Sequence, residues 1–155
     1  MKSIIKMTLF AVGFAVLSQG AFAQRNCRDA RGNLTESWSG GSDSTGTIGN
    51  GLWLNGTTLT VFTSAGFPTP VPTQFTYTAA FTITTGQGQL KGTRTFLSDV
   101  GTGWSVDMTI IDPSTSTGIF AGATGVLYVN QIKSNTAPPP TTYESEVNGR
   151  ICFTR

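Results

Sequence analysis

Apolar and polar side chains alternate with a period of two along most of this chain, as residues do on a β-strand that is half buried in a sheet. The pattern is longest in residues 75–83, 104–110 and 143–151, and shorter versions fall in residues 34–39, 51–54, 58–64, 89–97 and 118–132. No segment after residue 23 repeats apolar residues at helical spacing over the length of a helix. The sequence therefore predicts an all-β domain of about eight strands.

The first 23 residues are predicted to be a signal peptide. Lys2 and Lys6 precede an apolar run over residues 7–17, and Ala21 and Ala23 occupy the small-residue positions before a cleavage site. The run is too short to span a bilayer, which takes about 20 apolar residues. We therefore expect an exported domain over residues 24–155, secreted or periplasmic, that does not insert into a membrane.

Cys27 and Cys152 lie near the two ends of that domain. An exported compartment is oxidising, and an even number of cysteines there indicates a disulfide. A bond between them would bring the first and last strands side by side. Eight alternating strands can form a sandwich or a closed barrel. The bond favours a single eight-stranded antiparallel barrel with its N- and C-terminal strands joined.

The composition excludes several kinds of function. With no His and only 2 Cys, the chain cannot build a Ser-His-Asp triad, a His-ligated zinc site or a thiolate cage, so no metal site is expected. Removal of Lys2 and Lys6 with the signal peptide lowers Lys+Arg from 10 to 8, which equals the 8 Asp+Glu. A neutral domain lacks the clustered positive charge that nucleic-acid binding requires.

Two charged residues share a face with apolar neighbours. Glu36 lies between Leu34 and Trp38 at the period of two, and Arg94 lies on the same face as Phe96. A charged group that faces an apolar interior is costly unless it is paired. Three interpretations stay open: positions at the rim that reach water, a purely structural ion pair, or a site in which Arg94 binds a ligand and Glu36 is the catalytic acid or base.

The other candidate ligand-binding residues follow from the same alternation. Placing the apolar faces of residues 75–83 and 104–110 inside a barrel gives the composition usual for a small-molecule site. It also places Asp107 on the outer face. The candidates for ligand contact are Tyr77, Phe81, Trp104, Met108 and Tyr128. Packing of the core is the alternative role for the aromatic ones. The ligand would be largely apolar, with one oxygenated or anionic end near Arg94.

Residues 118–150 resemble a known family. The segment G-I-F-A-G-A-T-G-V-L-Y-V-N-Q-I begins at Gly118, and a proline-rich loop and T-Y-E-S-E-V-N-G-R follow it. This resembles the glycine-rich strand of the allene oxide cyclase family and, more distantly, of the dirigent proteins, with Ser116 where that pattern has its first glycine. The resemblance implies a calycin-like barrel that holds an apolar molecule in its lumen, needs no metal or organic cofactor, and steers ring closure or coupling of a reactive intermediate.

Three functions fit these expectations: a cofactor-free cyclase or isomerase, a non-catalytic carrier of an apolar ligand, and a structural or surface-interaction barrel whose lumen is filled by aromatic side chains. Export favours the second and third, because a short-lived intermediate is best handled beside the enzyme that makes it. Thr and Ser dominate the predicted outer face, with Leu97 and Ile111 as isolated apolar residues. We therefore expect a monomer or weak homo-oligomer, although members of the resembled family are often trimeric.

Overall fold

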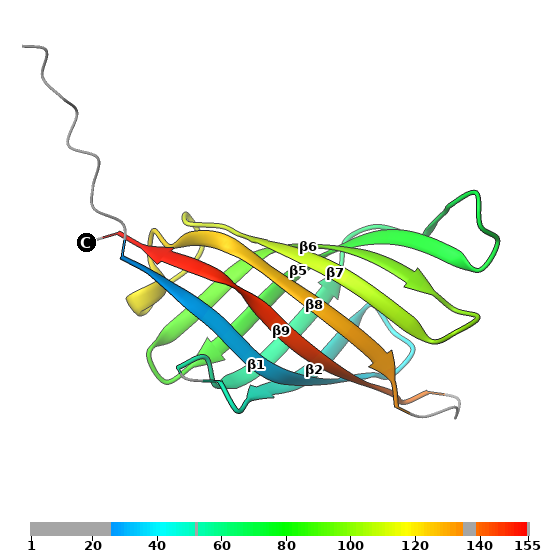
Figure 1. Cartoon of the computed structure of the whole chain (residues 1–155), viewed down its shortest axis with the longest axis horizontal. Helices are drawn as coiled ribbons and strands as arrows, with labels where there is room; N and C mark the ends of the chain where they lie inside the picture. Colours follow the sequence, from blue (N-terminus) through cyan, green and yellow to red (C-terminus); the bar gives the residue numbers. More distant parts are fainter. Residues whose placement is uncertain (1–25, 52, 135–138, 155) are drawn as a thin grey trace, which may run out of the picture.

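The computed structural model describes residues 26–51, 53–134 and 139–154, and its strands form one antiparallel sheet that closes into a barrel (Figure 1). The predicted signal peptide over residues 1–23 lies outside the described residues. The strands are β1 (Asn26–Trp38), β2 (Asp43–Gly49), β3 (Gly56–Phe62), β4 (Phe67–Pro68), β5 (Gln74–Thr85), β6 (Gly88–Asp99), β7 (Trp104–Ile111), β8 (Thr124–Lys133) and β9 (Thr141–Phe153).

Eight of these strands make the barrel wall, in the order β3-β2-β1-β9-β8-β7-β6-β5, and pairing of β3 with β5 closes it. The remaining strand, β4, is a two-residue addition that pairs with β5 at one end. The predicted eight-stranded antiparallel barrel is confirmed. Closure removes the exposed sheet edges that a sandwich would leave.

The first and last strands lie side by side along their whole length. β1 and β9 pair over all 13 residues of β1, and Cys27 is the register partner of Cys152. The predicted disulfide joins these two residues, whose Cα atoms are 3.9 Å apart. The covalent bond thus locks the seam where the two ends of the chain meet.

Aromatic side chains close one end of the barrel. Phe120 is fully buried there, and its ring lies 6.3 Å from that of Trp53 and 6.2 Å from that of Phe153. Phe120 belongs to a short 3-10 helix, η1 (Gly118–Phe120), and not to the strand predicted over residues 118–132. Gly118 has a φ of +62°, and a Cβ there would lie 2.1 Å from the Gln87 carbonyl oxygen, so the chain turns inward only with glycine.

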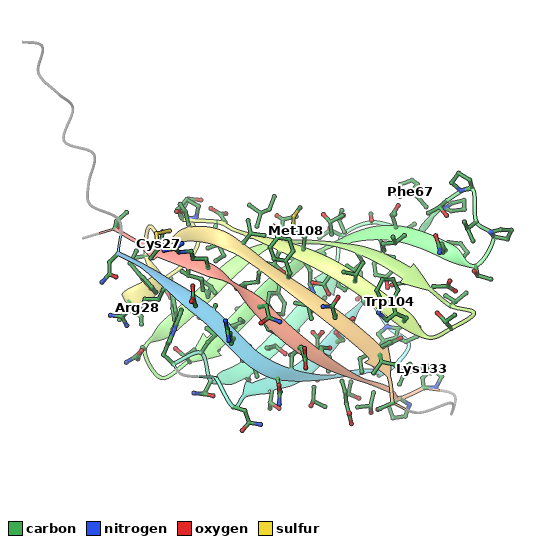
Figure 2. The ribbon with its side chains drawn as sticks, viewed as in Figure 1. Cys27, Arg28, Phe67, Trp104, Met108 and Lys133 are labelled. Carbon is green, nitrogen blue, oxygen red and sulfur yellow. A yellow bond between two sulfur atoms is a disulfide. The ribbon has the colours of Figure 1, made fainter. Side chains whose placement is uncertain are left out.

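The alternation in β7 is oriented opposite to the prediction. Trp104, Met108 and Ile110 lie outside the barrel with 43%, 37% and 54% of their surface exposed, and Figure 2 shows Met108 projecting from the outer side. Ser105 and Asp107 are buried on the inner side. A period of two separates the faces of a strand but does not say which face is inside. Here the buried Arg94 decides, because it needs an anionic partner in the lumen.

Candidate functional site: an aromatic cavity above a buried charge cluster

A buried ion cluster crosses the middle of the lumen and joins strands from opposite sides. Arg94 on β6 is fully buried, and its Nη1 donates to both oxygens of Glu36 on β1, at 2.8 and 3.0 Å. Its Nη2 donates to Asp107 Oδ2 on β7 at 2.8 Å. Alternation on β1 and β6 predicted the inward orientation of Glu36 and Arg94. The two residues therefore form a buried ion pair and are not rim positions that reach water, and Asp107 is an unforeseen third member.

Neighbouring polar side chains complete the hydrogen bonds of Glu36. Thr60 donates to Glu36 Oε1 at 2.7 Å and accepts from Arg94, and Gln131 Nε2 donates to Glu36 Oε2 at 2.8 Å. Ser44 contributes a longer bond of 3.4 Å. The carboxylate therefore accepts hydrogen bonds from four side chains. This saturation fixes Glu36 in place and leaves neither of its oxygens free to face a substrate.

Two aromatic rings enclose the guanidinium of Arg94. The ring centroids of Phe81 on β5 and Phe96 on β6 each lie 4.7 Å from its central carbon. Desolvated cation–π contacts of this kind are worth on the order of 2 kcal/mol. Phe81, a predicted ligand contact, therefore packs against Arg94 in the core. The predicted anchor for an anionic ligand is likewise unavailable, because Arg94 is enclosed by its own partners.

The cluster carries one net negative charge when both carboxylates are ionised. Burial raises the pKa of Asp107 to about 6, although Arg94 opposes that shift. Burial alone would lower the pKa of Arg94, but the Glu36 and Asp107 carboxylates outweigh it and raise that pKa above the ordinary value. Among the described residues, Asp107 Oδ1 has no hydrogen-bond partner. Burial thus moves the pKa of Asp107 toward neutrality.

Asp107 should make stability fall as the pH rises from about 4 to about 6. A carboxyl group whose pKa is higher in the folded than in the unfolded state stabilises the fold below its unfolded pKa, near 3.8, and loses this contribution as pH rises through about 6. The difference corresponds to at most about 3 kcal/mol, at 1.4 kcal/mol per pKa unit. Urea unfolding at pH 4, 5, 6 and 7 should show this decline in the wild type and not in Asp107→Asn. An identical profile in both proteins would contradict the assignment.

Above the cluster, a cavity of about 460 Å³ opens at the end of the barrel opposite Phe120. Its volume falls within the range of roughly 300–1,000 Å³ that small-molecule sites occupy. Glu36, Ser44, Ser105 and Gln131 contribute polar groups to its lining. Asp99 and Lys133 add one charge of each sign to the lining. Its aromatic residues are Trp38, Phe62, Phe75, Tyr77, Phe96, Trp104 and Tyr143.

A chain of three hydroxyl groups runs along one wall of the cavity. The Tyr77 hydroxyl is hydrogen-bonded to Ser98, and Ser98 is hydrogen-bonded to Ser105 at 2.8 Å. Burial raises the pKa of Tyr77 above its ordinary value, with the hydrogen bond from Ser98 acting in the other direction. Tyr77 therefore stays protonated at neutral pH. The chain can donate to or accept from a polar group of a ligand.

Of the other four predicted ligand contacts, two line the cavity and two lie outside the barrel. Tyr77 lies in the cavity wall. Met108 and Tyr128 lie outside the barrel, and Tyr128 is 54% exposed, so their predicted contact with a lumenal ligand is wrong. Trp104, at the start of β7, is 43% exposed on the outer face, but it also lines the mouth of the cavity. The errors at Met108 and Tyr128 follow from the inverted orientation of β7, because β8 pairs with it and shares its parity.

The sequence pattern did not identify several residues of the site. Phe62 lies on β3, where the alternation was short, and Ser98 and Ser105 looked like ordinary polar positions. Gln131 carried a usable signal, since it shares the inner face of β8 with Leu127 and Val129. A lone polar residue on an apolar face indicates a buried hydrogen bond. The proline-rich segment over residues 66–73 borders the cavity mouth through Gly66.

The fold and the cavity define a small closed β-barrel with an aromatic site at its open end. Comparisons with family models, curated proteins and solved structures gave no match. The resemblance to the allene oxide cyclase and dirigent families thus stays a prediction. Within the described ranges there is no group of three or more Cys, Asp or Glu side chains placed to hold a metal ion. Nor does that part of the chain contain a helix long and apolar enough to cross a membrane.

Proposed function

We propose that this protein binds a small, largely apolar molecule that carries a positively charged or hydrogen-bond-donating group. The observation that carries the proposal is the position of the aromatic cavity directly above a buried cluster with an excess of negative charge. Aromatic rings present the negative face of their quadrupole to a cation. Wall and floor therefore favour the same charge on the ligand.

The depth of the charge cluster sets how strongly it acts. Glu36 and Ser105 line the cavity. Asp107 lies two residues further along β7 than Ser105, which places it about 7 Å below the cavity lining. A charge at that distance acts with on the order of 2 kcal/mol at an effective dielectric constant near 20. This is enough to discriminate between a cationic and an anionic ligand of the same shape. The earlier expectation of an anionic end near Arg94 is replaced by its opposite.

Binding without catalysis is the function that the geometry supports best. The catalytic role predicted for Glu36 would need a free carboxylate oxygen facing the substrate. Both oxygens of Glu36 are engaged by Arg94, Thr60 and Gln131. A cyclase or isomerase could still act through shape and exclusion of water, and the enclosed aromatic cavity favours this as the second candidate. Both candidates require a ligand in the same cavity.

Three naphthalene probes of similar shape test the proposal: naphthylmethylammonium, naphthalenemethanol and naphthoate. Calorimetry at pH 7.5 should show the ammonium compound binding at least tenfold more tightly than the carboxylate, with the alcohol between them. At pH 5 the advantage of the ammonium compound should shrink several-fold, because Asp107, with a pKa of about 6, then becomes protonated. Asp107→Asn should remove that pH dependence and leave the affinity for the alcohol unchanged.

A pair of glycine variants assigns any binding to the cavity. Gly66 lines the mouth, and a Cβ there would meet only the Phe75 side chain at an ordinary distance of 3.7 Å, so Gly66→Trp should fold and obstruct entry. The matched control is Gly86→Trp in the β5–β6 turn, where a Cβ would meet nothing within 4 Å. Gly66→Trp should weaken all three probes and Gly86→Trp none. Absence of binding to the wild type, or a preference for naphthoate, would overturn the proposal.

A further inference from the structure

An apolar stripe covers the outer face of two neighbouring strands, β7 and β8. Register pairs the exposed side chains of the two strands directly: Trp104 with Ile132, Val106 with Asn130, Met108 with Tyr128, and Ile110 with Val126. Seven of the eight side chains in these four rows are apolar or aromatic. Ile132, Tyr128 and Ile110 are each more than half exposed, at 57%, 54% and 54%. Scattered apolar residues are normal on a surface, whereas a contiguous stripe of this kind indicates an interaction surface.

Charged residues flank the stripe with opposite signs at its two ends. Beside the Trp104–Ile132 row, the outward-facing acidic residues are Glu144 and Glu146 on β9. Asp99 on β6 adjoins the same row, but its carboxylate caps its own turn. Beside the Ile110–Val126 row, the outward-facing basic residues are Lys91 on β6, Arg150 on β9 and Arg31 on β1. Two acidic residues reduce the net positive charge of the basic end. Asp29 is the register partner of Arg150, and Asp112 uses its carboxylate to cap its own turn.

This distribution is self-complementary under one particular rotation. The two-fold axis lies in the plane of the interface, perpendicular to the strands, and crosses the stripe at its midpoint. Rotation about this axis reverses the direction of the strands in the second copy. It places β6 of one copy against β6 of the other, and β9 against β9. The acidic end of one protomer then faces the basic end of its partner on both flanks. Centring the axis on the four rows places the Trp104–Ile132 row over the Ile110–Val126 row of the partner. It also places Glu144 opposite Arg150 of the partner subunit.

The stripe is long enough for an extended contact. Its four rows span seven residues of each strand, about 23 Å at 3.3 Å per residue. A standard interface buries about 800 Å² per partner, so the flanking side chains of β6 and β9 have to contribute to the contact. An isologous dimer is also the commonest arrangement for a surface that complements itself.

We propose that the outer face of β7 and β8 is the interface of a two-fold symmetric homodimer. This replaces the expectation of a monomer or weak oligomer, which rested on an outer surface of Thr and Ser. The ligand cavity opens at the end of the barrel, whereas the stripe, with Met108 near its middle, runs along the side (Figure 2). Trp104 is the one residue of the stripe that also lines the cavity mouth. Dimer formation and ligand binding are measured separately, so either proposal can fail without the other.

Sedimentation velocity on the purified, disulfide-bonded protein at about 50 µM should give the mass of a dimer. Ile132→Lys and Ile110→Lys should each convert it to a monomer at that concentration, because each places a charge in the apolar stripe. The matched control is Leu59→Lys on β3, which lies on the opposite side of the barrel in the strand order and is similarly exposed, at 40%. Leu59→Lys should remain dimeric. Circular dichroism of all variants establishes that they are folded.

A charge exchange tests the two-fold geometry itself. Glu144→Arg should weaken the dimer at least tenfold by opposing Arg150 of the partner subunit, and Arg150→Glu should do the same by opposing the partner's Glu144. Combining both changes in one chain should restore the wild-type affinity to within a few-fold. Failure of the double variant to recover would overturn the proposed axis.

Other occupants of the stripe give distinct results. A wild-type monomer at 50 µM would overturn the proposal, and so would a stable trimer. A monomer that sediments with phosphatidylcholine vesicles would assign the stripe to a lipid surface instead. A dimer that the two lysine variants do not disturb would place the interface elsewhere.

Discussion

Arg94→Met is expected to remove about 3–5 kcal/mol of unfolding free energy or to prevent folding altogether. The change removes the only cation within hydrogen-bond distance of Glu36 and Asp107 among the described residues. It leaves two carboxylates in the lumen, where Asp107 is 3% exposed and Glu36 is 3% exposed. An uncompensated buried charge costs several kcal/mol, and methionine also forfeits the cation–π contacts with Phe81 and Phe96.

A compensated variant separates this effect from a simple loss of packing. Arg94→Met combined with Glu36→Gln and Asp107→Asn keeps similar volumes and removes all three charges. Replacement of a whole buried ion cluster by neutral groups is often close to neutral for stability. Urea unfolding of the triple variant should therefore recover most of the loss, to within about 2 kcal/mol of wild type. If the triple variant is as unstable as Arg94→Met, the arginine matters through packing and the electrostatic account is wrong.

The side chains that face the lumen differ on the two sides of the charge cluster. From the cluster to the closed end, the lumen is filled by apolar side chains such as Leu34, Ile83 and Leu127, all buried. Beyond it, Ser98, Ser105 and Ser44 replace such residues on the inner faces of β6, β7 and β2. Small polar side chains leave space that the surrounding aromatic rings border but do not occupy. The idea of a filled structural barrel thus holds for one half of the lumen and fails for the other.

The sequence was sufficient to predict the closure of the barrel and the pairing of its ends. Regular alternation identified most strands, and the positions of Cys27 and Cys152 placed β1 beside β9. Glu36 and Arg94 could be predicted as inward-facing because each interrupts an apolar face. These features are local, or depend on one covalent constraint. They can be read without knowing which strands pair in the rest of the sheet.

The inner face of β7 could not be predicted from its own residues. Trp104, Met108 and Ile110 are more apolar than Ser105 and Asp107, so burial alone would turn them inward. The observed orientation depends on Arg94, which lies on the neighbouring strand β6 and is the register partner of Thr109 on β7. This is a tertiary requirement, in which one buried cation outweighs the hydrophobicity of a neighbouring strand. The exposed stripe and the cavity both follow from it, and neither was visible in the sequence.

Removal of the Cys27–Cys152 disulfide is expected to cost about 2–5 kcal/mol of unfolding free energy while the barrel still folds. The bond closes a loop of 125 residues in sequence, nearly the whole of residues 24–155. In the chain-entropy model, opening a loop of this length releases on the order of 5 kcal/mol of entropy to the unfolded chain, which is the upper limit of the effect. The barrel still folds, because β1 and β9 keep all 13 of their register pairs without the bond.

Guanidinium unfolding of Cys27→Ser/Cys152→Ser beside the oxidised wild type measures this loss. The wild type under reducing conditions should unfold at the same midpoint as the double variant, since both lack the bond and differ only by two sulfur-to-oxygen changes. The denaturant dependence should be steeper for the reduced and variant proteins, because an unlinked chain exposes more surface when it unfolds. A midpoint that reduction leaves unchanged would mean that the 13 register pairs hold the ends together unaided. The disulfide would then contribute nothing measurable to the seam between β1 and β9.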